Sequence, residues 1–279
     1  MPRVRLYKSD LVELAFARPA EPLREYVRQY AAWFDRSREV VSRRHLPSGH
    51  VPLIINFDTP VRERKAGSAE WTEHRTFTAG LHDVFTLSES AGPNHGIQID
   101  FTAVGARLFY NRPLGQLANR SVALTDLIGR AAERLAAQLF DASTWEERFA
   151  VLDREIASTV FAASPVSAEV SWAWRALTRS AGRVRIADLV RHVGWSERHF
   201  ATQFRDQLGL TPKAFARVLR FGRAVRTLSS EHSATLADVA LSCGYYDQAH
   251  FTRDFQQFAG VTPLTLLGRR LASDGGFSA

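Results

Sequence analysis

The sequence of 279 residues contains a single cysteine, Cys243, which excludes an internal disulfide and a cysteine-rich zinc site. It has no apolar run of about 20 residues, the length that a membrane-spanning helix needs. The first residues also lack the apolar segment of a secretion signal, so a cytoplasmic location is expected. Gly-rich phosphate loops, nucleophile elbows and metalloprotease helices are absent as well. We therefore expect no enzyme activity, no catalytic residue and no cofactor.

The excess of positive charge lies near the carboxy-terminal end. The net charge is +7, and residues 183–270 hold 13 Lys and Arg against 7 Asp and Glu, whereas residues 1–182 hold 23 against 21. A local basic surface attracts polyanions through the release of counterions, and nucleic acid is the commonest such partner. A solvated basic face would have the same composition, so the charge alone does not decide the function.

An internal repeat with a spacing of about fifty residues is the strongest pattern in the chain. Residues 186–212 read IADLVRHVGWSERHFATQFRDQLGLTP, and residues 236–263 read LADVALSCGYYDQAHFTRDFQQFAGVTP. The offset between the copies is 50 residues before Gly194 and Gly244, and 51 residues after them. The second copy therefore has one extra residue just after its glycine.

Each copy has apolar residues at helical spacing that stop at the glycine and then restart. Gly194 suits the left-handed conformation at a helix end, and Ser196 and Asp247 are expected to cap the second helix of their copies. This pattern predicts two helix-turn-helix units with a helix that begins at Pro212 between them. The predicted ranges are about 186–208 for the first unit, 212–228 for the connecting helix and 235–258 for the second unit.

The second helix of each unit presents a polar face opposite its phenylalanines. Arg and Gln can read guanine and adenine with paired hydrogen bonds, and the methyl groups of Ala and Thr can meet that of thymine. The amino-terminal half of this helix enters the major groove in such motifs, which favours DNA binding over a purely structural repeat. The expected base-contacting residues are Arg198, Ala201, Thr202, Arg205, Gln248, Ala249, Thr252 and Arg253.

Residues from about 171 to 270 resemble the DNA-binding domain of the AraC/XylS family of transcription regulators. The resemblance rests on the Ala-Asp pair in both first helices, on GYYDQAHFTRDF at 244–255 and on GVTP at 260–263. It implies seven helices in two subdomains, with two recognition helices in successive major grooves of double-stranded DNA. It also implies the same eight base-contacting residues. The small side chains of Ala201 and Thr202 depart from the well-characterised members of the family, which predicts fewer base contacts by the first unit than by the second.

Phosphate contacts are expected beside the recognition helices. Lys213, Arg217 and Arg220 fall near one face of the connecting helix, where they would position the protein on DNA, and simple solvation is the alternative.

A boundary near 162–167, rich in Ala, Ser and Pro, separates this part from the rest. It predicts an effector-sensing or dimerisation domain over 1–164 and a DNA-binding domain over 165–279.

The amino-terminal part has the pattern of a mixed domain. Between 37 and 103, short apolar runs separated by turn residues predict strands, and apolar residues at helical spacing before and after this region predict helices. The fold class expected is α+β, with a mixed sheet or partial barrel followed by helices and then an all-α domain. The strands are expected at 51–57, 75–80, 84–87 and 96–101, and the helices at 22–34, 103–110, 130–140 and 145–162.

In the AraC/XylS family this position holds a variable domain for ligand sensing or dimerisation. The resemblance implies a small-molecule effector or a homodimer, and RNA polymerase as a partner if the protein is an activator. Residues 44–57 resemble the amino-terminal domain of one uncharacterised branch, which names no ligand, and the effector-binding residues stay unknown. Phe57, Phe77, Phe85 and Phe101 would either line an apolar pocket or form plain core.

A metal-sensing or catalytic amino-terminal domain fused to a DNA-binding tail is the alternative function. Imidazoles could gather around a metal ion, but their spacing matches no ligand motif, so no metal site is expected. Alkyl transfer to Cys243 is not expected either, because this residue matches the apolar Val193 in the repeat. The candidate ligands for a metal are His45, His50, His74, His82 and His95, with Asp83 and Asp100.

Overall fold

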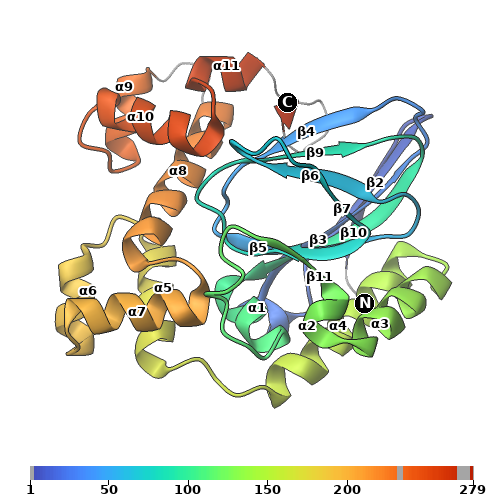
Figure 1. Ribbon diagram of the computed structural model, residues 1–279, viewed down its shortest axis with the longest axis horizontal. Helices are drawn as coiled ribbons and strands as arrows, with labels where there is room; N and C mark the ends of the chain where they lie inside the picture. Colours follow the sequence, from blue (N-terminus) through green and yellow to red (C-terminus); the bar gives the residue numbers. More distant parts are fainter. Residues whose placement is uncertain (1–2, 231–234, 269–276, 279) are drawn as a thin grey trace.

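The computed structural model describes residues 3–230, 235–268 and 277–278. Figure 1 shows a sheet-rich half formed by the amino-terminal residues beside a helical half formed by the carboxy-terminal residues. The long helix α8 (Pro212–Ser230) runs between two groups of helices in the second half. This arrangement confirms the α+β fold class.

The larger sheet has seven antiparallel strands in the order β1-β2-β3-β10-β5-β8-β11. Its centre is apolar on the buried face, because Ile97 lies opposite Ile55 and Ile99 lies opposite Leu53, and all four are buried. Such cross-strand pairs of aliphatic residues stabilise a sheet through their mutual contact. The strands are β1 (Val4–Lys8), β2 (Val12–Ala17), β3 (Val27–Asp35), β5 (His50–Asn56), β8 (Thr76–Ala79), β10 (Asn94–Thr102) and β11 (Ser121–Ala123).

The smaller sheet has five strands in the order β12-β4-β9-β6-β7. Within the described ranges no strand pair joins the two sheets, so β7 and β11 remain end strands and the structure is an open, partial barrel. The sequence predicted this class of domain. The strands of the smaller sheet are β4 (Val41–His45), β6 (Val61–Lys65), β7 (Thr72–His74), β9 (Thr86–Ser90) and β12 (Phe277–Ser278).

Helices cover one side of the larger sheet. Phe149 of α4 stacks on Tyr30 of β3 with the ring centroids 5.5 Å apart, and the Tyr30 hydroxyl donates to Asp153 over 2.8 Å. A capping box between Thr144 and Glu147 satisfies free backbone donors at the start of α4. The helical elements of this half are η1 (Glu21–Leu23), α1 (Ala103–Phe109), α2 (Leu124–Ile128), α3 (Arg130–Asp141) and α4 (Trp145–Ala162), which include the three helices predicted between 103 and 162.

The helix predicted over 22–34 is wrong, because only a short 3-10 turn and then strand β3 occupy this region. Val27, Tyr30 and Phe34 have helical spacing, which is the source of the error. The segment instead pairs with β2 on one side and with β10 on the other. Pairing on both sides satisfies the backbone groups of β3, and this tertiary contact overrides the local pattern.

Other strands differ from their predicted positions. The run predicted at 84–87 begins two residues later, as β9, and β1 and β2 lie outside the predicted strand region altogether. β1 is an edge strand whose side chains are mostly exposed, so it lacks the apolar alternation that marks a half-buried strand. The strands predicted at 51–57, 75–80 and 96–101 are confirmed to within two residues by β5, β8 and β10.

Seven helices follow residue 167 in the described part of the chain. Together with α8 they are α5 (Ala168–Arg179), α6 (Ile186–Val193), α7 (Glu197–Leu208), α9 (Leu236–Ser242), α10 (Gln248–Ala259) and α11 (Pro263–Gly268). In Figure 1, α6 and α7 lie beside one end of α8, and α9 and α10 lie beside the other end. The resemblance implied this number of helices and this connection.

The two halves are held together at the ends of two of these helices. The backbone N–H of Gly115 donates to the carbonyl of Asp206 near the end of α7 over 2.9 Å. Arg44 of β4 donates to the carbonyl of Ala259 at the end of α10 over 2.8 Å. The sheet-rich half therefore contacts both helix pairs, which positions one pair relative to the other.

Candidate DNA-binding surface

The first helix pair is formed by α6 and α7. Gly194 ends α6 with φ 76°, a left-handed conformation that glycine adopts without strain. Ser196 then caps α7, where its hydroxyl accepts from the backbone N–H of His199 over 3.2 Å. Only two residues separate the glycine from the first residue of α7, so the two helices meet in a tight turn.

The second pair, α9 and α10, repeats this geometry with one extra residue. Gly244 has φ 83° at the turn, and Asp247 accepts from the backbone N–H of His250 over 2.7 Å at the start of α10. Thr235 and Asp238 form a capping box at the start of α9. Both caps predicted from the repeat, Ser196 and Asp247, are therefore present.

Phenylalanines fix the orientation of the two second helices. Phe200 and Phe204 on α7 are fully buried, as are Phe251 and Phe255 on α10. Because these side chains point into the core, the opposite face of each helix points outward. The predicted base-contacting residues lie on this outer face: Arg198, Thr202, Arg205, Gln248, Ala249 and Arg253 are exposed, and Ala201 and Thr252 are half-buried.

The outer face of α7 offers fewer free polar groups than its sequence suggests. The Thr202 hydroxyl donates to the carbonyl of Arg198 over 2.9 Å, and Ala201 has no polar group. The hydroxyl of Thr202 is therefore committed to its own helix, a common arrangement for threonine inside helices. Arg198 and Arg205 are the long polar side chains of the predicted set on this helix.

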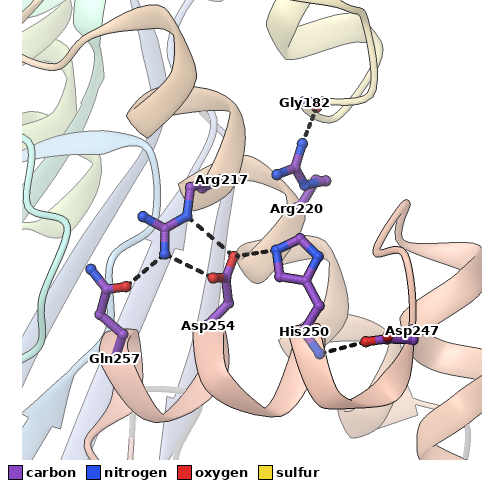
Figure 2. A network of polar contacts seen from close by, with 7 residues as sticks. All are labelled: Gly182, Arg217, Arg220, Asp247, His250, Asp254 and Gln257. Carbon is purple, nitrogen blue, oxygen red and sulfur yellow. Dashed lines mark hydrogen bonds and ion pairs between the residues drawn. The ribbon is translucent and has the colours of Figure 1, made fainter.

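Arg217 is predicted as a phosphate contact, and the structure gives it internal partners (Figure 2). Its guanidinium donates to both carboxylate oxygens of Asp254, over 2.8 and 3.3 Å, and to the side chain of Gln257 over 2.6 Å. The side chain of Asp254 is only 7% exposed, so this pair joins α8 to α10 inside the module. The hydrogen bonds with Asp254 raise the pKa of Arg217, which keeps the guanidinium charged.

Arg220 and Lys213, the other two predicted phosphate contacts, differ in whether they have partners inside the protein. Arg220 donates to the carbonyl of Gly182 over 3.1 Å, which links α8 to the turn before α6 (Figure 2), and its guanidinium lies 5.8 Å from the ring centre of Tyr245. Lys213 is exposed in the first turn of α8. Of the three predicted phosphate contacts, Lys213 is the one whose surroundings are mainly solvent. The phosphate roles of all three stay predictions.

Two residues beside the predicted site were not among the sequence-based predictions. Asp254 lies on the buried side of α10, where it pairs with Arg217. Its place in the sequence beside phenylalanines did not indicate this pair. Tyr246 is the extra residue of the second turn, and it is 88% exposed directly before the cap of α10. The one-residue offset in the repeat was a signal for Tyr246, because an insertion beside a recognition helix changes what that helix end presents.

The four phenylalanines considered for an apolar pocket do not gather around one. Phe101 is fully buried and stacks on Phe109 with centroids 4.9 Å apart, and Phe77 stacks on His74 at 4.9 Å. Phe57 contacts His95 and Phe140, while Phe85 lies beneath the guanidinium of Arg44. These four side chains form separate contacts, so the reading as plain core and surface packing describes them better than a shared pocket.

Of the five amino-terminal histidines, His74 and His82 line one cleft. Across residues 3–230, 235–268 and 277–278, no group of three or more His, Cys, Asp and Glu is placed to hold a metal ion. Cys243 is buried on the inner side of the second helix pair, as its match to Val193 predicted. A search of the described helices for a stretch that is long and apolar enough to cross a membrane finds none.

Comparison with known proteins divides the chain in the same way. Residues 189–269 match the family described as Helix-turn-helix domain, and residues 16–123 match a domain of unknown function (DUF6597). An uncharacterised HTH-type transcriptional regulator of Staphylococcus aureus is 33% identical over 87 residues, which are 31% of this chain and 12% of that protein. The HTH-type transcriptional regulator ArgR of Pseudomonas aeruginosa is 32% identical over 76 residues, which are 27% of this chain and 23% of that protein.

Solved structures resemble the chain over different extents. A probable AraC family transcriptional regulator from Rhodopseudomonas palustris is 30% identical, with a TM-score of 0.34, and the match covers 37% of this chain and 97% of that one. ToxT from Vibrio cholerae is 10% identical, with a TM-score of 0.46, and the match covers 88% of this chain and 98% of that one. By this family match, residues 189–269 are a helix-turn-helix domain. It is of the AraC type, and through it the chain belongs with the AraC/XylS family of transcription regulators.

Proposed function

We propose that this protein is a sequence-specific DNA-binding transcription regulator whose amino-terminal domain binds a small-molecule effector. The observation that carries the proposal is the pair of outward faces on α7 and α10. Both faces start at a capped helix end, both carry arginine or glutamine, and both helices lie beside the ends of α8 (Figure 1). Two such helices on one rigid connector suit two major grooves of one duplex.

We divide the chain between residues 164 and 165, in the segment between α4 and α5. Residues 1–164 form the effector-sensing domain and residues 165–279 the DNA-binding domain, from which the short strand β12 pairs with β4 of the smaller sheet. The predicted partners are double-stranded DNA, an effector, a second copy of the chain and, for an activator, RNA polymerase. Because the proposed partner is DNA, we propose a cytoplasmic location, and we assign the protein no catalytic role.

Base recognition falls on exposed side chains of α7 and α10 in this proposal. Arg198, Arg205, Gln248 and Arg253 would donate to base edges, while Ala201, Thr202, Ala249 and Thr252 would contribute apolar contacts. Lys213 would position the module on phosphate, and the exposed hydroxyl of Tyr246 is suited to the same task beside the second helix. Arg217 and Arg220 act first by holding α8 to its neighbours, and a phosphate contact would use the donors that these bonds leave.

The test is a selection of genomic DNA fragments on the purified full chain, followed by footprinting of the recovered site. Arg253→Ala is then expected to weaken binding to that site by about 1–3 kcal/mol and to relax the base preference at one position, because it removes a two-bond contact. Arg154→Ala, which removes an exposed arginine from α4, is the matched control and should bind normally. An unchanged base preference in the Arg253→Ala protein would contradict the assignment of α10.

A further inference from the structure

A polar cleft of about 150 Å³ lies where the two sheets fail to close. It is lined by residues of β6 and β7 from the smaller sheet, by Ser121 of β11 at the end of the larger sheet, and by Asn119 just before β11. A water molecule takes up about 30 Å³ in the liquid, so this volume suits a molecule of about amino-acid size. The lining is dominated by charged and hydrogen-bonding groups, which exclude an apolar ligand.

Opposite charges face this cleft from a single strand. Glu63 and Lys65 both line it, and because they are two residues apart on β6 their side chains lie on the same face of the strand, about 7 Å apart at the backbone. No salt bridge joins them, and in the part of the chain that the structure describes, no side chain forms a hydrogen bond or ion pair with the Glu63 carboxylate. Separated charges of this kind can each pair with one end of a ligand that carries both signs.

His82 adds a hydrogen-bond acceptor to the cleft. Its Nδ1 lies 2.7 Å from the carbonyl of Gly80, and since a carbonyl only accepts, Nδ1 carries the proton. Burial lowers the pKa of His82, so the ring is neutral and its Nε2 is an acceptor. With the carboxylates of Glu63 and Glu70, this gives three acceptors for an ammonium group, while Lys65 supplies the cation for a carboxylate.

The segment 81–86 connects the cleft to both recognition helices. His82 and Thr86 line the cleft, and the backbone N–H of Asp83 donates to the side chain of Asn119 over 3.1 Å. Leu81, the first residue of the segment, lies beside Gly209 at the end of α7, and Phe85 packs on Gly260 at the end of α10 so closely that a methyl group on this glycine would not fit. A displacement of segment 81–86 would therefore change the packing at the carboxy-terminal ends of both α7 and α10.

We propose that the cleft binds a small zwitterion of amino-acid size, with its ammonium group on Glu63, Glu70 and His82 and its carboxylate on Lys65, and that the segment 81–86 transmits its binding to α7 and α10. The second part rests on the proposed function, because it needs DNA binding as a readout. The first part concerns the free protein alone.

The test of the site uses the full-length protein without DNA. Each of the twenty free L-amino acids is added at millimolar concentration in a thermal-shift assay, and any hit is titrated by calorimetry beside its decarboxylated amine and its deaminated acid. At least one amino acid should raise the melting temperature, and both analogues should bind at least tenfold more weakly because each lacks one charge. The site is refuted if no amino acid shifts the melting temperature, or if an analogue binds as tightly as its parent.

Variants show whether binding occurs in this cleft. Glu63→Gln and Lys65→Met should each weaken binding of the hit by about tenfold or more, since each removes a charged hydrogen-bonding partner. Glu73→Gln is the matched control: it removes an exposed carboxylate on the neighbouring strand β7, outside the cleft, and should bind normally. Normal binding by both Glu63→Gln and Lys65→Met would overturn the assignment.

The coupling is measured last, as the affinity for the selected DNA fragment with and without the amino acid. We expect the two affinities to differ, and the DNA to change the affinity for the amino acid by the same factor. If the amino acid binds and DNA binds but neither affects the other, the connection through 81–86 is wrong. If no DNA fragment is selected while the amino acid still binds, the regulatory function fails and the cleft assignment stands.

Discussion

The Arg217–Asp254 pair allows a sharp test of how the second recognition helix is held. Arg217→Met keeps the length of the side chain but removes its charge, which leaves the Asp254 carboxylate, 7% exposed, without its main partner. His250 Nε2 lies 3.9 Å away and cannot replace two hydrogen bonds. Stranding one member of a buried pair costs about 3–5 kcal/mol, and since Arg217 is itself 27% exposed we expect about 3 kcal/mol of lost unfolding free energy.

A second substitution should reverse much of this loss. In the double variant Arg217→Met with Asp254→Leu, neither charge remains, and an apolar replacement of a buried pair is often close to neutral. We expect it to lie within about 1 kcal/mol of the starting protein, which implies a coupling energy of about 2–3 kcal/mol between the two positions. Urea unfolding followed by circular dichroism on all four proteins measures this cycle.

The same proteins separate the two roles that Arg217 could have toward DNA. If it acts by holding α10, the double variant recovers DNA affinity along with stability. If it mainly binds phosphate, the double variant stays as weak as Arg217→Met, and binding by both shows a reduced salt dependence. A coupling energy near zero in the unfolding cycle would refute the reasoning, because the pair would then contribute nothing to the position of α10.

Two further predictions concern stability. Phe204→Ala and Phe255→Ala should each cost about 3–5 kcal/mol and unfold one helix pair, since both rings are fully buried, and normal thermal melting of either variant would show that the helix faces are assigned the wrong way round. Burial, with repulsion from Arg28, lowers the pKa of His50 from 6.5 to about 4. Between these values the unfolded chain binds more protons, so stability should fall by about 3 kcal/mol as the pH drops from 6.5 to 4. His50→Gln should flatten this decline in urea titrations at several pH values, and an unchanged slope would count against the assignment.

The carboxy-terminal half was predictable because its signals are local. Capping side chains, glycines at helix ends and apolar stripes act over a few residues, and the repeat presents each of them twice, so Ser196, Gly194 and Asp247 could be placed without coordinates. The phenylalanines then dictated which face of each second helix points outward. The internal role of Arg217 could not be predicted in this way, because its partner is 37 residues away and the contact depends on how α10 packs on α8.

The amino-terminal half shows the limit of local patterns. Residues 27–35 have helical spacing but form a strand, because two neighbouring strands that are distant in sequence supply their hydrogen-bonding partners. The candidate cleft likewise collects β6, β7, His82, Thr86 and the region around Asn119, and no motif in the sequence links these segments. Only the topology of two unclosed sheets brings them together.

The amino-acid sequence by itself determined the two helix-turn-helix units, their caps, their buried phenylalanines and the polar residues on the outer faces, because each of these follows from contacts within a few turns of one chain segment. The tertiary structure decided which arginines are committed to internal carboxylates, where the sheets stay open, and which short segment touches both recognition helices. These features depend on contacts between residues far apart in the chain, whose free energies no local pattern records.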